Sequence, residues 1–395
     1  MGRVKELLME MEEHGYGFLT SGEKYVCSHH FEDIYLNQYI EHHGGTGDCS
    51  YCGRKEIVID MSDLANHIAM TISIYYNDID SECLPLASSY FDNENEHIPG
   101  IKRVRCYAVP ENADIYEDTF EIMRYLGLHT DNDSLNDDID HIFENNTWIK
   151  KDPFELWWNQ KKELQWQRFS DMVKHSRRFT FLAMSRVASN DDILEDLGDI
   201  LRNMDGILHP IPIGTTLYRT RSLDKEPDDR FGFTDITSAP DKYAGQCRMS
   251  PAGVSMFYGA FDMDTAVAES IKIANEKALV IGEFKTTREL TVVDLIALPR
   301  EVSIWMNNWE AVSFLKSFHK DITRPLINNA KEAIEYIPSQ IFTEYLRWMF
   351  TDKQGRNIDG LMYRSCKTQK ANVVLFCNNE NSHKWLNLEN LSTRK

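Results

Sequence analysis

Two short cysteine motifs near the start of this 395-residue chain carry side chains that could bind a metal ion. Cys27 and His30 form a C-x2-H motif, and after eighteen further residues Cys49 and Cys52 form a C-x2-C motif. Thiolate and imidazole ligands suit zinc, and two knuckles at this spacing can close a tetrahedral site. A closed shell of four protein ligands leaves no position for water, so the spacing predicts a structural zinc.

The histidine ligand has alternatives nearby. His29 is adjacent to His30, and His42 and His43 precede the second motif, where the glycines of GGTGD allow a sharp turn around a metal. We assign His30 by its spacing and keep the other three histidines as alternatives. Chance proximity of cysteines and surface histidines is the competing explanation.

Arg124 and His129 form a second pattern with chemical potential. Arg124-x4-His129 fits the loose R-x4-6-H signature of HEPN ribonucleases, which use such a pair on phosphodiesters. About two such matches are expected by chance in this composition, and the surrounding acidic residues would repel RNA. We therefore interpret the pair as helix-surface residues. An RNA-binding protein or a HEPN-type ribonuclease remains an alternative function.

A third group of motifs lies in the second half of the chain. The stretch CRMSPAGVSMFYGAFDMDTAVAES, residues 247–270, runs from a turn through aromatic residues into a short helix whose apolar face carries one carboxylate, Glu269. LYRTR precedes this stretch, and MYRS and NVVLF follow it. In order and spacing these motifs resemble the RES-domain family, named for Arg, Glu and Ser, over about the last 190 residues. The segment with the cysteine knuckles is similar to the HEPN/RES N-terminal domain that precedes some RES domains.

The resemblance implies a fold similar to ADP-ribosyltransferase toxins and an enzyme that consumes NAD. Such an enzyme splits off nicotinamide with phosphate or water as acceptor, or moves ADP-ribose onto a protein. Small members of the family are toxins neutralised by a helical antitoxin. We therefore expect a toxin-like effector that degrades NAD in bacterial toxin–antitoxin or phage-defence growth arrest, with a protein ADP-ribosyltransferase using the same site as the alternative.

The resemblance also assigns site residues. Carried onto this sequence, the two family arginines correspond to Arg219 and Arg248, the tyrosine to Tyr258, the glutamate to Glu269 and the serine to Ser365. We expect all five to be catalytic, and all but Glu269 to contact NAD as well.

The sequence departs from the family pattern after the second arginine, and it offers a further arginine beside the first. Small family members often have a Trp-Asn-like pair after the second arginine, whereas this chain has Met249 and Ser250, which changes the expected local contacts with substrate. Residues two apart on a strand face the same way, so Arg221 could share the pocket with Arg219 as a further substrate-binding residue.

The assigned residue types suit the implied chemistry. Cleaving the nicotinamide–ribose bond passes through an oxocarbenium-like state, which a carboxylate such as Glu269 beside the ribose can stabilise. The guanidinium forks of Arg219 and Arg248 can grip the pyrophosphate. Tyr258 would stack on the nicotinamide, and Ser365 would donate a hydrogen bond to the ribose or the carboxamide.

The elements that must position these residues indicate an α+β chain. IVIDMSDLANHIAMTISIYY has helical spacing with Ser62 as N-cap, and from residue 207 β-type runs alternate with a helical stretch near AIEYIPSQIFTEYLRWMF. We predict a mainly helical N-terminal domain with a zinc knuckle and a C-terminal mixed β-sheet domain of the ADP-ribosyltransferase-like type. A G-x-G-x-x-G loop after a strand is lacking, so NAD would be substrate and not hydride carrier.

Charge and composition divide the chain into three segments. Residues 111–146 hold eleven Asp or Glu and one Arg, whereas the following stretch is basic and rich in tryptophan. We therefore predict a HEPN/RES-type domain over 1–146, a helical Trp-rich connector over 147–206 and a RES catalytic domain over 207–395. The connector reads as an amphipathic element that packs its indoles, with a nucleic-acid surface as the alternative.

The overall composition limits location and partners. Hydrophobic residues make up 42% of the chain, enough for a sizeable core, and the formal charge of −19 argues against general nucleic-acid binding. Eight sparse cysteines, with neither a signal-type start nor a membrane-length apolar run, favour a reduced, cytoplasmic protein without a membrane partner. The expected partners are NAD and an antitoxin or another inhibitory or activating protein. A homo-oligomer is left open.

Overall fold

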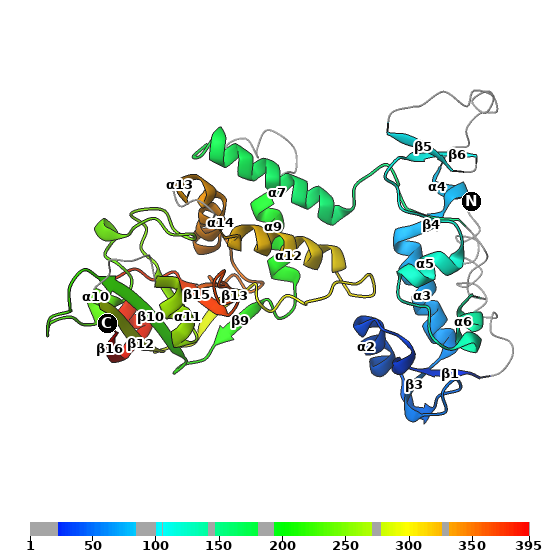
Figure 1. Ribbon diagram of the computed structural model, residues 1–395, viewed down its shortest axis with the longest axis horizontal. Helices are drawn as coiled ribbons and strands as arrows, with labels where there is room; N and C mark the ends of the chain where they lie inside the picture. The colour runs from blue at the N-terminus through cyan, green and yellow to red at the C-terminus, as the bar shows by residue number, and fades with distance from the viewer. Residues whose placement is uncertain are drawn as a thin grey trace. The chain divides into compact units, whose positions relative to one another are not determined.

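The computed structural model describes residues 23–83, 100–104, 106–140, 147–180, 193–270, 278–325 and 332–394 (Figure 1). The chain forms two compact units, one of Met1–Trp157 with Glu301–Trp309 and the other of Trp158–Arg300 with Glu310–Lys395. In the described parts, no helix combines the length and the apolar character that a membrane span requires. The expected limits at residues 146/147 and 206/207 stay predictions.

The first unit begins with a small antiparallel sheet in the order β1-β3-β2. Its strands are β1 (Tyr25–Cys27), β2 (Gly45–Asp48) and β3 (Lys55–Asp60). The short 3-10 helix η1 (Ser28–His30) and helix α2 (Ile34–His43) connect β1 to β2. This sheet carries both cysteine motifs on adjoining turns.

Helix α3 (Met61–Tyr75) supplies the centre of the first core. Leu64, Ile68 and Ile72 recur at helical spacing and are buried, as the periodicity predicts. The expected N-cap was wrong: Asp60 caps the helix, and its carboxylate accepts the Ser62 backbone N–H at 2.8 Å. The chain reaches Asp60 as the last residue of β3, so the extended backbone that an N-cap needs occurs two residues earlier than expected.

The rest of the first unit consists of short strands and helices. A second sheet has the order β4-β8-β7, and β5 and β6 form a separate hairpin. The strands are β4 (Tyr76–Asp78), β5 (Ile101–Val104), β6 (Tyr107–Pro110), β7 (Ile115–Tyr116) and β8 (Trp148–Lys150). The helices are α4 (Ile79–Glu82), α5 (Thr119–Tyr125) and α6 (Asp133–Asp140).

The second unit is built on a mixed eight-stranded sheet in the order β16-β12-β10-β11-β15-β14-β13-β9. Only β13 and β14 pair in parallel; the other neighbours are antiparallel. The strands are β9 (Leu208–Ile211), β10 (Thr216–Leu223), β11 (Phe257–Ala260), β12 (Ala278–Thr286), β13 (Leu290–Asp294), β14 (Gly360–Arg364), β15 (Ala371–Leu375) and β16 (Leu386–Arg394). The expected mixed β-sheet in the C-terminal half is thus confirmed.

Helices cover one face of this sheet (Figure 1). They are α7 (Trp158–His175), α9 (Ile193–Asn203), α12 (Trp309–Thr323), α13 (Glu332–Glu335) and α14 (Ile337–Trp348). Phe314, Phe318 and Phe342 pack with Val374 of the sheet in the core between the layers. The opposite face packs its own apolar side chains, among them Phe284, under the short helix α10 (Phe233–Ile236). Helix α11 (Met263–Ser270) follows β11 and contacts β10, β11 and β15.

The tryptophans of the predicted connector are largely core residues. Trp148 is fully buried in the first unit, and Trp166 is 3% exposed in the second. Trp157 packs beside the first core, with the Lys150 ammonium 4.4 Å from its ring centre. Only Trp158, at 37%, counts as exposed among these four indoles. This distribution favours the packing interpretation over a stacking surface for nucleic acid.

Candidate functional site

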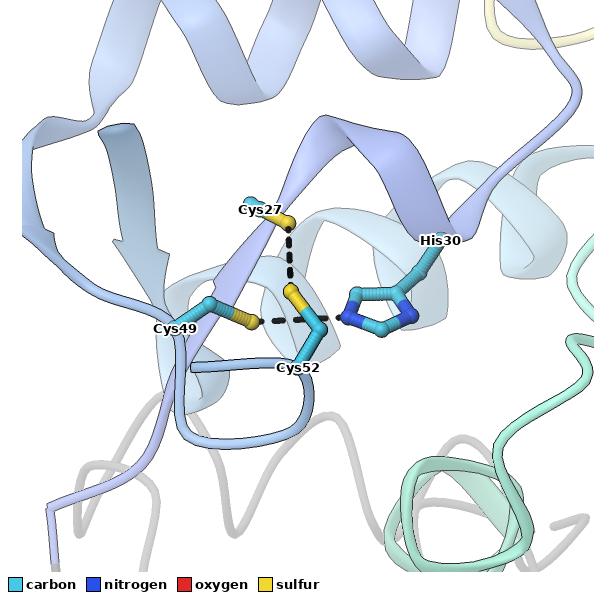
Figure 2. A group of neighbouring side chains, drawn as sticks. All are labelled: Cys27, His30, Cys49 and Cys52. Carbon is cyan, nitrogen blue, oxygen red and sulfur yellow. Dashed lines mark hydrogen bonds between the residues drawn. The ribbon is translucent and has the colours of Figure 1, made fainter. Parts of the chain in front are cut away.

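The two cysteine motifs meet in the first unit. The ligand atoms of Cys27, His30, Cys49 and Cys52 all lie within 4.8 Å of one another (Figure 2). Cys27 Sγ is 3.6 Å from Cys52 Sγ, and Cys49 Sγ is 3.4 Å from His30 Nε2. Two thiolates on one tetrahedral zinc would be about 3.8 Å apart, and a thiolate and an imidazole nitrogen about 3.6 Å, given the usual bond lengths. The four side chains therefore fit a single metal ion.

Local backbone structure creates this cluster. Cys27 is the last residue of β1 and His30 the last of η1, whereas Cys49 and Cys52 lie on the turn between β2 and β3. That turn closes through Gly53, whose positive φ of 70° suits a residue without a side chain. Because β3 pairs with both β1 and β2, it brings the two turns side by side.

The surroundings keep His30 neutral and shift the pKa values of the Cys27 and Cys49 thiols in opposite directions. Burial, followed by the positive charge of Arg54, lowers the pKa of His30, so the imidazole stays in its metal-binding form. Burial raises the pKa of the Cys27 thiol. Burial also opposes ionisation of Cys49, but hydrogen bonds from the backbone of Tyr51 and Cys52 outweigh it and lower the Cys49 pKa.

The alternative histidines have other surroundings. His29 Nδ1 is 2.9 Å from Glu56 Oε2, and these two form a second, three-membered group with Cys27. His43 Nδ1 lies 2.9 Å from the Tyr39 carbonyl oxygen. Of the candidate histidines in the described chain, His30 alone belongs to the four-membered group.

The second unit contains a cavity of about 820 Å³ where β10 and β11 diverge. These strands share a single register pair, Tyr218 with Ala260, whereas β10 pairs with β12 over eight residues. Arg219, Arg248, Tyr258 and Glu269 all line the cavity. Its volume lies in the usual range for sites that hold small molecules and cofactors.

Arg219 is half-buried at the divergence of the two strands. Its Nη1 donates to the Tyr258 carbonyl oxygen at 2.8 Å, and its guanidinium carbon lies 5.5 Å from the centre of the Phe257 ring. Its buried Nε has no hydrogen-bond partner among the described residues. Burial lowers the pKa of the guanidinium. A buried donor group without a partner at a cavity is suited to an anionic ligand.

Arg248 enters the cavity from the loop before β11. Its Nη1 donates to the Ile322 carbonyl oxygen at 3.0 Å, and its guanidinium carbon lies 4.7 Å from the centre of the Tyr336 ring. The Ser339 hydroxyl donates to the Arg248 carbonyl oxygen at 2.7 Å. The second arginine is therefore held by the end of α12 and the start of α14.

Tyr258 contacts Ser250, one of the two residues at which this chain departs from the family pattern. The Tyr258 hydroxyl lies 2.8 Å from Ser250 Oγ, and burial raises the pKa of this phenol well above its usual value. Met249 is fully buried in the core. The two residues that replace the Trp-Asn-like pair thus support the tyrosine and fill the core.

Glu269 is held by two buried polar side chains. Ser365 Oγ donates to Glu269 Oε1 at 2.6 Å, and Asn372 Nδ2 donates to the same oxygen at 2.8 Å. Ser365 is fully buried, and its oxygen also accepts the backbone N–H groups of Lys367 and Thr368, each at 3.2 Å. With both acceptor positions used, the serine proton points to Glu269.

Arg221 lies outside this cavity. Its side chain is exposed, and Nη1 donates to the Asp235 carbonyl oxygen of α10. Beyond the divergence β10 continues beside β12, which carries Arg221 away from β11. The structure therefore brings together the five residues assigned by the family motifs but not Arg221.

Sequence reasoning missed Asn372, which lines the cavity and contacts Glu269. The sequence does contain a signal for this residue. Asparagine is disfavoured in β-strands, yet it begins the otherwise apolar strand run NVVLF. The Arg124 and His129 side chains are exposed in the first unit, and His129 contacts the edge of the Phe120 ring with 4.8 Å between centroids.

Family models match both halves of the chain. Residues 42–187 match HEPN/RES N-terminal domain 1, and residues 216–386 match the RES domain. The chain is therefore a member of the RES-domain family with an N-terminal HEPN/RES domain. The first match includes Cys49 and Cys52 but begins after Cys27 and His30. No curated protein and no solved structure matched the chain. At the level of the family, the RES domain is associated with toxin-like enzymes that act on NAD.

Proposed function

We propose that the RES domain binds NAD in the cavity between β10 and β11 and cleaves its nicotinamide–ribose bond. The observation that carries this proposal is the charge arrangement of the cavity. Glu269 is the one carboxylate among the described residues that line it, and Arg219 and Arg248 line it as well. A dinucleotide needs cations for its pyrophosphate and one anion beside the ribose that becomes positively charged.

The proposed reaction is a displacement at the ribose carbon that carries nicotinamide. The carbon–nitrogen bond breaks, and its electron pair returns to the ring nitrogen, so nicotinamide leaves as a neutral molecule. Glu269 stabilises the positive charge that develops on the ribose. An oxygen of water or phosphate then bonds to the same carbon and loses its proton to solvent. A cationic leaving group that departs neutral needs no general acid.

The remaining site residues bind NAD or orient Glu269. Arg219 and Arg248 grip the pyrophosphate through guanidinium N–H groups, and the Tyr258 ring contacts the nicotinamide. Ser365 has its proton directed to Glu269, so we propose that it acts through that carboxylate rather than by donating to NAD. The eight-stranded sheet has a cavity where β10 and β11 share only one register pair, and this arrangement supports an ADP-ribosyltransferase-like fold.

The biological role that fits this activity is growth arrest by loss of NAD. Family membership and the NAD-sized cavity support a toxin-like effector of the toxin–antitoxin or phage-defence kind. An antitoxin or another inhibitory or activating protein would then regulate it. Transfer of ADP-ribose to a protein would use the same cavity with another acceptor.

The test is to incubate the purified chain with NAD, with and without phosphate, and to measure nicotinamide and the ADP-ribose products. We expect nicotinamide release by the natural chain and a loss of about 100- to 1,000-fold in Glu269→Gln, which keeps the size but removes the charge. Glu344→Gln, on the exposed side of α14, is the matched control and should retain full activity.

The identity of the product shows which acceptor the enzyme uses. Free ADP-ribose indicates water, a phosphorylated ADP-ribose indicates phosphate, and label from NAD on a protein band indicates a transferase. Intact NAD in every condition, including those with candidate activating proteins, would overturn the enzyme proposal. Equal rates for Glu269→Gln and the natural chain would overturn the mechanism alone.

A further inference from the structure

Asn372 is the second side chain that holds the carboxylate of Glu269. Its Nδ2 and Ser365 Oγ both donate to Oε1 of Glu269, at 2.8 and 2.6 Å. No described residue donates a hydrogen bond to the other carboxylate oxygen, Oε2. The carboxylate is therefore held on one oxygen, while the other remains an acceptor in a cavity that Glu269 lines.

Asn372 occupies a place where an apolar residue would be expected. It is 4% exposed in β15, which pairs on both sides, with Ala260 of β11 and Tyr363 of β14 opposite Asn372. Its Oδ1 is buried and has no hydrogen-bond partner among the described residues. An unpaired buried carbonyl oxygen lowers stability, so the fold gains nothing from this amide beyond the N–H that it gives to Glu269.

The orientation of the amide follows from the donors and acceptors. Turning the amide over would place Oδ1 against Oε1, and two acceptors would then face each other. With Nδ2 toward Glu269 the contact is a hydrogen bond to a carboxylate, which is stronger than one between neutral groups. The donor is itself uncharged, so it leaves the negative charge of Glu269 in place, unlike a lysine.

Glu269 needs such support because of its position. It lies in the last turn of the eight-residue helix α11, where the helix itself does little to fix a long side chain. Ser365 reaches Oε1 from the loop after β14 and Asn372 reaches it from β15. Two donors from separate parts of the chain restrict the carboxylate to one orientation.

We propose that Asn372 is a positioning residue that directs Oε2 of Glu269 to the ribose of NAD. This inference rests on the proposed function. With Oε1 occupied by two donors, Oε2 is the oxygen that accepts a ribose hydroxyl and faces the developing positive charge. Asn372 acts on the rate of bond cleavage through Glu269, and contributes little to the binding of NAD.

Replacement of Asn372 by alanine tests this division of roles. We expect Asn372→Ala to lower kcat for nicotinamide release by about 10- to 100-fold, because the carboxylate is then held by Ser365 alone and can turn about that one hydrogen bond. KM for NAD should change less than about threefold, since the arginines still bind the pyrophosphate. An unchanged kcat, or a loss confined to KM, would overturn the proposal while leaving the proposed function standing.

The near-isosteric Asn372→Asp gives a readout that a purely structural role would not produce. Its carboxyl group can donate to Glu269 only when it carries a proton, so activity should be retained at low pH and fall as the pH rises. The control is Asn390→Asp on the exposed part of β16, whose pH profile should match that of the natural chain. A loss in Asn372→Asp that is the same at every pH would contradict the proposed hydrogen bond.

A measurement without turnover separates the two proposals. The side-chain amide signals of Asn372 in nitrogen-15 NMR spectra should shift in Glu269→Gln and stay unchanged in Glu344→Gln. If they shift while the natural chain releases no nicotinamide, the contact stands and the proposed function fails. If the natural chain is active and the signals do not respond to Glu269→Gln, the function stands and the role of Asn372 is refuted.

Discussion

At the scale of single residues, two residues that line the cavity between β10 and β11 each carry a buried polar atom with no partner among the described residues. These atoms are Nε of Arg219 and Oδ1 of Asn372. Buried polar atoms without partners cost stability and occur mainly where function requires them. Both residues line the same cavity as Glu269, which is consistent with a polar ligand there.

Arg219 and Arg221 offer a matched pair for a prediction at this scale. Arg219→Lys removes a planar two-pronged donor from the cavity, so we expect KM for NAD to rise about tenfold or more. Arg221→Lys changes an exposed residue that does not line the cavity, and KM should stay within about twofold. The measurement is initial-rate kinetics of nicotinamide release, with thermal melting to verify folding. A larger effect for Arg221 would restore it as the substrate-binding residue.

At the scale of elements, hydrogen bonds join the acidic segment to the cysteine motifs. Lys24 Nζ donates to both carboxylate oxygens of Asp138, at 2.8 and 2.6 Å, and the Tyr51 hydroxyl donates to Oδ2 at 2.7 Å. Tyr51 lies between Cys49 and Cys52, so α6 is joined directly to the second knuckle. Asp138 is buried, and its carboxylate links α6 to the turn that carries Cys49 and Cys52.

The knuckle leads to a prediction about metal content. The natural chain should carry about one zinc per molecule, and Cys49→Ser should lose most of it, because three ligands bind zinc far more weakly than four. The first unit of that variant should also melt at a lower temperature. Cys106→Ser, an exposed cysteine of the same unit, is the control and should keep its zinc. Metal analysis of freshly purified protein decides the question; equal zinc in Cys49→Ser would contradict the assignment.

At the scale of the whole molecule, each compact unit is built from two separate stretches of the sequence. Residues Glu301–Trp309, which follow β13 and end at the first residue of α12, belong to the first unit although the flanking residues belong to the second. Trp305 is 7% exposed in the first core, and its indole N–H donates to the Leu126 carbonyl oxygen at 3.1 Å. A segment encoded after residue 300 therefore completes a core that begins near residue 26.

This arrangement predicts an effect of a distant residue on the first unit. Trp305→Ala should lower its free energy of unfolding by about 3 to 5 kcal/mol, the usual cost of removing a buried aromatic side chain. Trp348→Ala, which is 69% exposed in the second unit, should change stability by less than about 0.5 kcal/mol. Urea unfolding followed by circular dichroism measures both. A Trp305→Ala variant as stable as the natural chain would show that the segment is not part of this core.

Much of the molecule follows from local sequence signals. The spacing of Cys27, His30, Cys49 and Cys52 is a short-range property, because two tight turns impose the ligand geometry once a strand joins them. The mixed sheet follows from runs of β-branched and aromatic residues, and family membership from the order of the RES motifs. Each of these signals is a short motif or run, and the family assignment adds only the order of such motifs along the chain.

Other features depend on partners far apart in the sequence, and only the tertiary structure decided them. Asn372 reaches Glu269 across 103 positions because of the register of β15 beside β11. The single pair between β10 and β11 opens the cavity for Arg219 and leaves Arg221 outside. Which strands become neighbours, when they lie far apart in the sequence, depends on how the whole sheet packs and cannot be deduced from a local pattern. The sequence by itself therefore determined which residues could do chemistry, and the packing of strands and helices decided which of them meet.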